Sequence, residues 1–374
     1  MMKKTFVWIL VALAVLAIVV IGVQRSKNTG ETGDINIGVL LPLTGPLAFF
    51  GGPEKDAISM AVDDVNAAGG IDGRKVQVSI EDSKASAKDG VSALQKLLLG
   101  TPLAVVTSLT TVSNATLPIL RDAKVPQIAL SIHPDLVTQS EYAVRPYAGY
   151  EDEIKLLVRF ASARAYKRVA VLWVMVPECE AAVNRVLVPG VRQSGGQVVA
   201  SESFNFGAPN AKAQLTKIAA AKPDLILVMD FGTLIGSILK DSETLGLRQK
   251  VVVDLGILTS PPIDKQLLEG VRIVSPAFAI SPTSSYTEFA RRFKERTKGE
   301  AIYDVAYTYD AMNVLFEGIR RSKGKQADLI PAIRAMGELE GVTGTMRMNP
   351  DGNVSVSMGF GVYRNGSIQP LSVP

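Results

Sequence analysis

The fold is decided by residues 35–83, which read INIGVLLPLTGPLAFFGGPEKDAISMAVDDVNAAGGIDGRKVQVSIEDS. The stretch opens with an apolar run, typical of a buried strand, and this run ends in a turn rich in Pro and Gly. Pro53 and Glu54 then stand where a helix should begin, because proline has a helical φ and a carboxylate is favoured by the positive end of the helix dipole. Apolar residues at helical spacing continue to Gly69-Gly70, and residues 75–81 alternate between polar and apolar with the period of a strand.

A strand, a helix and a second strand in this order form a βαβ unit with parallel strands. The loop at residues 42–52 follows the first strand, so we expect it at the carboxyl edge of the sheet, where α/β folds bind their ligands. The alternation continues to about residue 147, with a strand expected at residues 127–130. A second series of similar size runs from Glu151 to Val274, with a helix expected from about Glu178 to Gln193 and a strand at residues 225–229. Two consecutive series predict an α/β protein with two doubly wound lobes. Helices and hairpins follow from residue 285, and their pattern does not show which lobe they join.

The composition excludes several classes of function. The chain has 374 residues and a formal net charge of +4, and its basic residues are scattered, so we expect no nucleic-acid partner. Cys179 is the only cysteine in the sequence, which excludes an internal disulfide and a Cys-based zinc cluster. The sequence contains no GxSxG, HExxH or GxxxxGK[ST] motif. We therefore expect no enzyme, no metal site and no cofactor.

Residues 1–34 are expected to lie outside the folded body. Lys3 and Lys4 precede an uncharged run at residues 5–23, and a polar, Gly-containing tether follows. The run is longer than the core of a usual signal peptide and long enough to span a bilayer, and it has no small-x-small cleavage signal at its end. A cleaved signal peptide and an uncleaved membrane anchor both stay open. Either one places the rest of the chain in the periplasm or elsewhere outside the cytoplasm.

A group of hydroxyl residues marks a second loop at the predicted sheet edge. Thr110, Thr111 and Ser113 lie between a predicted strand at residues 103–107 and a predicted helix that ends near Ala123. The free N–H groups and positive end of a helix favour an anion there, and the hydroxyls add donors. The same residues could simply cap the helix. The residues alone leave both interpretations open.

Residues 38–83 resemble the N-terminal signature of the leucine/isoleucine/valine-binding protein family, and the resemblance extends more loosely to the C-terminus. These are periplasmic solute-binding proteins that serve ABC importers. The resemblance implies the type I periplasmic binding protein fold, in which three strands form a hinge, with crossings near Tyr147, Phe278 and Thr345. The expected lobes are residues 35–147 with 279–345, and residues 148–278 with 346–374.

The resemblance also implies which side chains of the first lobe face the ligand. Thr110 falls at the position of the family's key serine, in the loop that holds the ligand carboxylate, and Thr111 follows it. Phe50 matches an aromatic residue that packs over the ligand. Ser131 and His133 belong to a segment that is similar to the family's ISPSAT-type sequence but one residue shorter. We expect all five residues in the cleft between the lobes.

The second lobe departs from the family pattern. Cys179 and Phe231 stand in loops where the family has tyrosines, and Asp254 lies near the family's acidic residue that binds a ligand ammonium. The carboxylate half of an amino-acid site is therefore retained, whereas the ammonium half differs. We expect a small carboxylate ligand with an apolar body, either an apolar amino acid of the branched-chain type or an aromatic or aliphatic acid without the amine.

Three functions remain possible on these grounds. The main expectation is a solute-binding protein whose closed form is recognised by the membrane subunits of an ABC importer. The same lobes also serve as ligand-sensing domains of receptors, and a membrane anchor at the N-terminus would suit that role. An enzyme with a Cys179 nucleophile would require the fold to bring that thiol close to His133.

Overall fold

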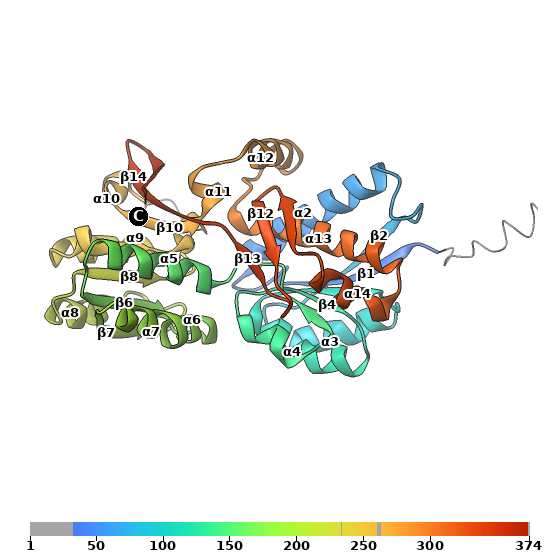
Figure 1. Cartoon of the computed structure of the whole chain (residues 1–374), viewed down its shortest axis with the longest axis horizontal. Helices are drawn as coiled ribbons and strands as arrows, with labels where there is room; N and C mark the ends of the chain where they lie inside the picture. The colour runs from blue at the N-terminus through green and yellow to red at the C-terminus, as the bar shows by residue number, and fades with distance from the viewer. Residues whose placement is uncertain (1–32, 233, 260–262, 373–374) are drawn as a thin grey trace, which may run out of the picture.

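The computed structural model of the chain describes residues 33–372, except for residue 233 and residues 260–262. Two α/β lobes lie side by side along the longest axis of the molecule (Figure 1). Each lobe has its own central sheet and its own buried apolar cluster. The predicted fold class, an α/β protein with two doubly wound lobes, is therefore confirmed.

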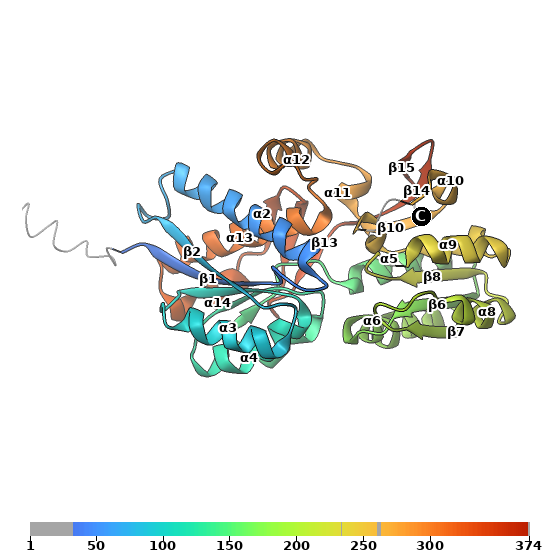
Figure 2. The same ribbon diagram turned by 180° about the vertical axis from the view of Figure 1, so that it is seen from behind.

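The first lobe is built on a five-stranded parallel sheet. Its strands, in spatial order, are β2 (Val76–Asp82), β1 (Ile35–Leu41), β3 (Ala104–Ser108), β4 (Gln127–Leu130) and β5 (Ala143–Val144). One face of the sheet is covered by α2 (Ala48–Ala67) and α13 (Tyr303–Ser322), and the other by α3 (Ala87–Leu98) and α4 (Thr110–Asp122) (Figures 1 and 2). The lobe also contains the 3₁₀ helix η1 (Pro134–Gln139), α12 (Ser284–Thr297) and α14 (Gln326–Arg334).

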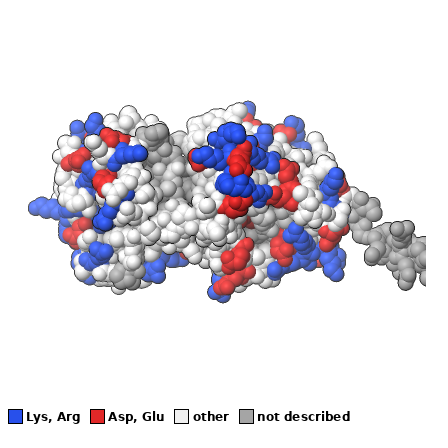
Figure 3. Space-filling view, turned by 90° about the horizontal axis from the view of Figure 1, so that it is seen from above, with Lys and Arg blue, Asp and Glu red and all other residues white. Residues whose placement is uncertain are grey.

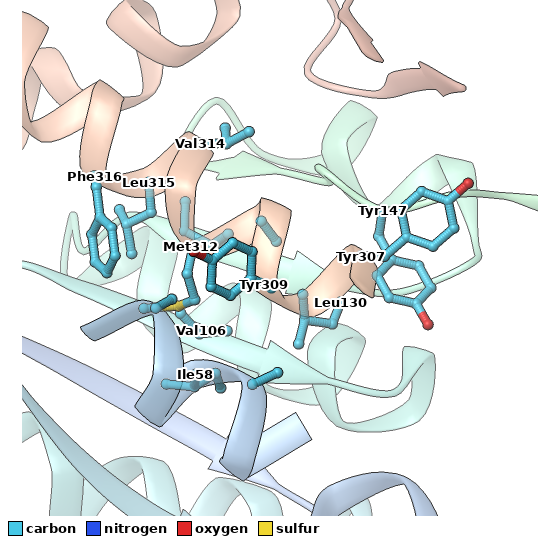
Figure 4. Close-up of a cluster of buried hydrophobic side chains, with 14 of the residues drawn as sticks. Ile58, Val106, Leu130, Tyr147, Tyr307, Tyr309, Met312, Val314, Leu315 and Phe316 are labelled. Carbon is cyan, nitrogen blue, oxygen red and sulfur yellow. The ribbon is translucent and has the colours of Figure 1, made fainter. Parts of the chain in front are cut away.

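The two apolar layers of this lobe explain why β1 has no polar side chain after the exposed Asn36. Val39 of β1 packs in the cluster that joins the sheet to α2 and α13, whereas its neighbour Leu40 packs in the cluster formed with α3 and α4. Figure 4 shows part of the first cluster, in which Met312 of α13 lies close to Val106 of β3 and Ile58 of α2. A strand buried on both faces has no polar side to show in its sequence.

Helix α2 begins earlier than the sequence pattern predicts. It starts at Ala48 rather than Pro53, so that Pro53 lies inside it. Gly51 makes this possible because it lies against the Pro42 backbone, where a side-chain carbon would be 2.3 Å from the carbonyl oxygen. The extra turn adds Phe50 to the same helix as Glu54.

The second lobe has a seven-stranded sheet. In spatial order its strands are β15 (Ser367–Pro370), β14 (Met358–Arg364), β10 (Arg272–Pro276), β9 (Val251–Val253), β8 (Leu225–Met229), β6 (Arg168–Val174) and β7 (Gln197–Phe204). β14 is antiparallel to both of its neighbours, and the other pairs are parallel. The helices are α5 (Tyr150–Ala163), α6 (Pro177–Ala182), the π-helix η2 (Val183–Leu187), α7 (Val188–Gln193), α8 (Lys212–Ala220), α9 (Ile235–Thr244), the 3₁₀ helices η3 (Arg248–Lys250) and η4 (Leu255–Thr259), α10 (Lys265–Leu268) and α11 (Ala277–Ile280).

The chain passes between the lobes after β5, after α11 and at Ser357. We expected the third crossing near Thr345, but Thr345 lies within a three-stranded sheet of β11 (Glu338–Gly341), β12 (Gly344–Met348) and β13 (Val354–Val356). This sheet belongs to the first lobe, because Met346 and Val354 are buried in that lobe's core. Asp310 of α13 also holds the turn between β11 and β12, because it accepts hydrogen bonds from the backbone of residues 342–343.

On the face seen in Figure 3, basic side chains lie among acidic ones and form no continuous basic patch. Over α12, for example, Arg291 pairs with Glu288 and Glu295. No helix within the described part of the chain is long and apolar enough to cross a membrane. The apolar run at residues 5–23, for which we expected a signal peptide or an anchor, lies outside the described residues.

Candidate ligand-binding site

A cavity of about 250 Å³ lies between the two lobes. The first lobe lines it with the start of α2, the loop between β3 and α4, the end of β4 and the start of α13. The second lobe contributes Val176 and Glu178, which flank the start of α6, together with Phe206 and Phe231. The carboxyl ends of β3 and β4 thus face the cavity, as expected for a ligand site in an open α/β sheet.

The first turns of α2 present one face to the cavity. Leu47, Phe50 and Glu54 all line it, and their spacing of three and four residues places them on the same side of the helix. Phe50 is buried and lies 4.4 Å, between ring centroids, from Phe49, which is exposed. Of this Phe pair, Phe50 therefore supplies an apolar wall.

The start of α4 opens into the cavity without a side-chain cap. Leu109, the residue before the helix, has a φ of 70°, which a leucine rarely adopts, and it is held there because its N–H donates to Leu130 O at 3.1 Å. This turn places Thr110 and Thr111 on the cavity wall. No side chain among the described residues caps the helix, so its first N–H groups are available to an anion.

The other hydroxyls and the histidine of the predicted site divide into two groups. Ser131 lines the cavity, and its Oγ lies 3.0 Å from Thr110 Oγ1. Ser113 instead faces the core, where its Oγ lies 2.9 Å from Thr107 Oγ1. His133 does not line the cavity, because its Nδ1 accepts a hydrogen bond from Asp135 N and so caps η1.

The predicted residues of the second lobe are not all at the surface of the cavity. Phe231 lines it and makes an edge-to-face contact with Phe206, at 6.3 Å between ring centroids. Cys179 and Asp254 are both buried behind it and line no part of it. Burial raises the pKa of the Cys179 thiol well above its ordinary value, which keeps the thiol protonated and makes it a poor nucleophile.

Asp254 belongs to a buried acidic group of the second lobe. Its Oδ1 accepts a hydrogen bond of 3.1 Å from Gly256 N, and nearby Glu153 accepts one of 2.8 Å from Leu255 N. Burial, followed by repulsion from Asp230, raises the pKa of Asp254 well above its ordinary value. These contacts hold the start of η4 against α5, which is a structural role.

Two acidic residues that the sequence did not single out as ligand contacts do line the cavity. They are Glu54 of α2 and Asp304 of α13, and each is about 2% exposed. Glu54 Oε1 accepts a hydrogen bond of 2.7 Å from Ser108 Oγ, and Asp304 Oδ1 accepts one from the hydroxyl of Tyr147. Glu54 Oε2 and Asp304 Oδ2 have no partner among the described residues.

The environment of Glu54 and Asp304 disfavours the ionised form of both carboxyl groups. Burial, together with repulsion from Asp304, raises the pKa of Glu54 well above its ordinary value, although the hydrogen bond from Ser108 acts against this. Burial raises the pKa of Asp304 to about 7, and the hydrogen bond from Tyr147 offsets part of the effect. No group of three or more metal-ligating residues occurs in the described part of the chain, so the pair is not part of a recognisable metal site.

Comparison with known proteins decides the family. A model of the periplasmic binding protein family matches residues 34–367. The chain belongs to this family. The family binds solutes and is not enzymatic, as expected from the absence of catalytic motifs. The predicted relationship to leucine/isoleucine/valine-binding proteins is likewise confirmed.

Two relatives of this periplasmic binding protein differ in how similar they are to it and in how much of the chain they match. The Leu/Ile/Val-binding protein BraC3 of Rhizobium johnstonii is 45% identical, but over only 65 residues, which are 17% of this chain and 18% of that protein. A leucine-, isoleucine-, valine-, threonine- and alanine-binding protein of Pseudomonas aeruginosa is 23% identical over 338 residues, covering 88% of this chain and 89% of that protein.

A solved structure shows the same fold over nearly the whole chain. It is the solute-binding protein of an ABC transporter from Rhodopseudomonas palustris in complex with 3,4-dihydroxybenzoic acid. The TM-score is 0.76 at 18% identity, and the alignment covers 91% of this chain and 99% of that one. The periplasmic binding protein described here therefore has the same two-lobed fold.

Proposed function

We propose that this protein captures a small carboxylate between its lobes and delivers it to an ABC importer. The observation that carries the proposal is the uncapped start of α4 at the wall of the interlobe cavity. There the N–H groups of the first turn, the positive end of the helix and the hydroxyls of Thr110, Thr111 and Ser131 converge, and together they favour an anion.

The rest of the cavity favours an apolar ligand body. Phe50 of the first lobe and Phe206 and Phe231 of the second are aromatic walls. Such faces suit an aliphatic or aromatic group, in keeping with the amino acids named for the Pseudomonas aeruginosa relative and the aromatic acid bound by the Rhodopseudomonas palustris protein. An apolar amino acid of the branched-chain type is our first expectation, and a carboxylic acid without an amine is the second.

Because both lobes line the cavity, we propose that the ligand docks on the first lobe and that the second lobe then closes over it. Closure is favoured only to the extent that the ligand binds the closed form more tightly. Small-angle scattering with and without saturating ligand should show a smaller radius of gyration in the bound protein. An unchanged radius alongside proven binding would contradict closure.

Calorimetry tests the carboxylate site. The panel consists of apolar amino acids, the corresponding acids without the amine, and neutral sugars. Thr110→Ala removes a hydroxyl beside the anion, and a charge-assisted hydrogen bond is worth about 1.5–3 kcal/mol, so affinity should fall about tenfold or more. Thr110→Ser should retain binding, and Thr216→Ala, on the exposed face of α8 in the second lobe, is the matched control. Tight binding of a sugar, unaffected by Thr110→Ala, would contradict the proposal.

Membrane attachment is a separate part of the proposal. The apolar run at residues 5–23, without a cleavage signal at its end, favours a chain that is at least partly retained at the membrane. Cell fractionation combined with N-terminal sequencing tests this. If every mature chain begins after Val23, the segment is a cleaved signal peptide only.

A further inference from the structure

The cavity has an acidic lining that a simple carboxylate does not match. Its acidic lining residues, within the described part of the chain, are Glu54, Glu178 and Asp304, and no Lys, Arg or His lines it there. The start of α4 supplies a partial positive charge on one wall only. A ligand that carries nothing but a carboxylate would therefore enter a space in which any of these side chains that ionises would repel it.

Glu54 and Asp304 are also incompletely satisfied. They come from different helices, α2 and α13, and each uses one oxygen to accept a hydrogen bond from a hydroxyl of the cavity wall, Ser108 or Tyr147. The second oxygen of each carboxyl group is buried and has no partner among the described residues. Buried carboxyl groups are costly when unpaired, and their usual partners are cations with several donors.

An ammonium group fits these two vacant acceptors. It carries three N–H donors and no acceptor, so it can donate to both carboxyl groups, and its positive charge favours their ionised forms. The acidic part of the cavity and the start of α4 are close along the chain, because Ser108, which donates a hydrogen bond to Glu54, is separated from Thr110 by Leu109 alone. A single small molecule can therefore reach both.

We propose that Glu54 and Asp304 form a cation subsite that binds the ammonium group of an amino carboxylate whose carboxylate lies at the start of α4. The inference rests on the proposed function and narrows it to zwitterionic ligands. It also assigns the ammonium contact to the first lobe, whereas the sequence pointed to Asp254 of the second, which does not line the cavity. The body of the ligand then lies against Phe50 and Phe231.

Matched pairs of probes test this subsite. Leucine is compared with 4-methylpentanoate, and phenylalanine with 3-phenylpropanoate, by calorimetry on the full mature protein. At least one amino member should bind, and its counterpart without the amine should bind tenfold more weakly or worse. Asp304→Asn and Glu54→Gln keep the size of each side chain and an oxygen for Tyr147 or Ser108. Each should weaken the amino member tenfold or more and leave the amine-free acid unchanged or bound more tightly.

The controls separate this inference from the proposed function. Glu317→Gln removes a carboxylate from the surface of α13, far from the cavity lining, and should change neither member of a pair. Thermal unfolding of each variant shows whether it is folded. If the amine-free acids bind as tightly as their amino counterparts and both variants affect the two alike, the cation subsite is wrong and the carboxylate site stands. If no carboxylate of either kind binds, the proposed function fails and this inference fails with it.

Discussion

Replacing Asp304 by asparagine should stabilise the ligand-free protein at alkaline pH. The carboxyl group is fully buried, and burial raises its pKa from an ordinary value of 3.8 to about 7 in the folded protein. The folded state therefore holds a proton that the unfolded state has lost between these two pH values. The free energy of unfolding falls with rising pH wherever the folded state binds more protons than the unfolded state. Ionisation of Asp304 therefore destabilises the protein as the pH rises from about 4 to about 7.

The magnitude follows from the shift. Each pKa unit corresponds to about 1.4 kcal/mol, so a shift of about three units costs roughly 4 kcal/mol once the pH exceeds 7. Glu54 shares this environment and its pKa is also raised, so the two groups titrate as a pair and the measured effect belongs to both. Tyr147 and Tyr303, which also face the pair, stay neutral over this range, because burial raises their pKa above 10.

Urea unfolding of the ligand-free protein between pH 4 and pH 8 measures this. Near pH 4 the parent and Asp304→Asn should have similar free energies of unfolding, because protonated aspartate and asparagine are both neutral. At pH 8 the variant should be more stable by several kcal/mol. If the difference between the two proteins stays within about 1 kcal/mol across the range, Asp304 is not held in the environment described here.

Two further predictions concern the close approach of α2 to the Pro42 backbone and the contact between the lobes. Gly51→Ala should destabilise the protein by about 1–3 kcal/mol, because the new carbon meets the Pro42 carbonyl at 2.3 Å. Gly52→Ala, which has open space around it, should be neutral or slightly stabilising. Urea unfolding compares the two variants, and equal effects would contradict the close approach of Gly51 to Pro42. Arg185→Ala removes an ion pair with Asp135 that joins the lobes. Because this pair is largely exposed, it is worth at most about 1 kcal/mol, so ligand affinity measured by calorimetry should fall by no more than about fivefold. A larger loss of affinity would show that the pair does more than bridge the lobes.

The strands were the part of the fold best predicted from the sequence. The predicted strands at residues 127–130 and 225–229 coincide with β4 and β8, because parallel strands buried on both faces leave continuous apolar runs. Helix boundaries were predicted less well. The single helix expected from about Glu178 to Gln193 contains a π-helical turn before Pro189, which has no N–H to continue the helical hydrogen bonds.

The residue pattern predicted only the part of the site whose residues are close together in the sequence. Thr110 and Thr111 follow a strand and begin a helix, a pattern visible without the structure. Asp304 gives no such signal, since its position beside Glu54 depends on the packing of α13 against α2 from a distant part of the chain. Glu54 was visible as a helix-start residue, but its place on the cavity wall depends on the earlier start of α2.

The most direct measurement is a crystal structure of the protein with leucine or phenylalanine, whichever binds more tightly, in the interlobe cavity. We predict the carboxylate at the start of α4, within about 3 Å of the backbone N–H or hydroxyl of Thr110 or Thr111. We also predict the ammonium within the same distance of Glu54 and Asp304. A ligand bound outside the cavity, or one whose carboxylate lies away from α4, would contradict these predictions.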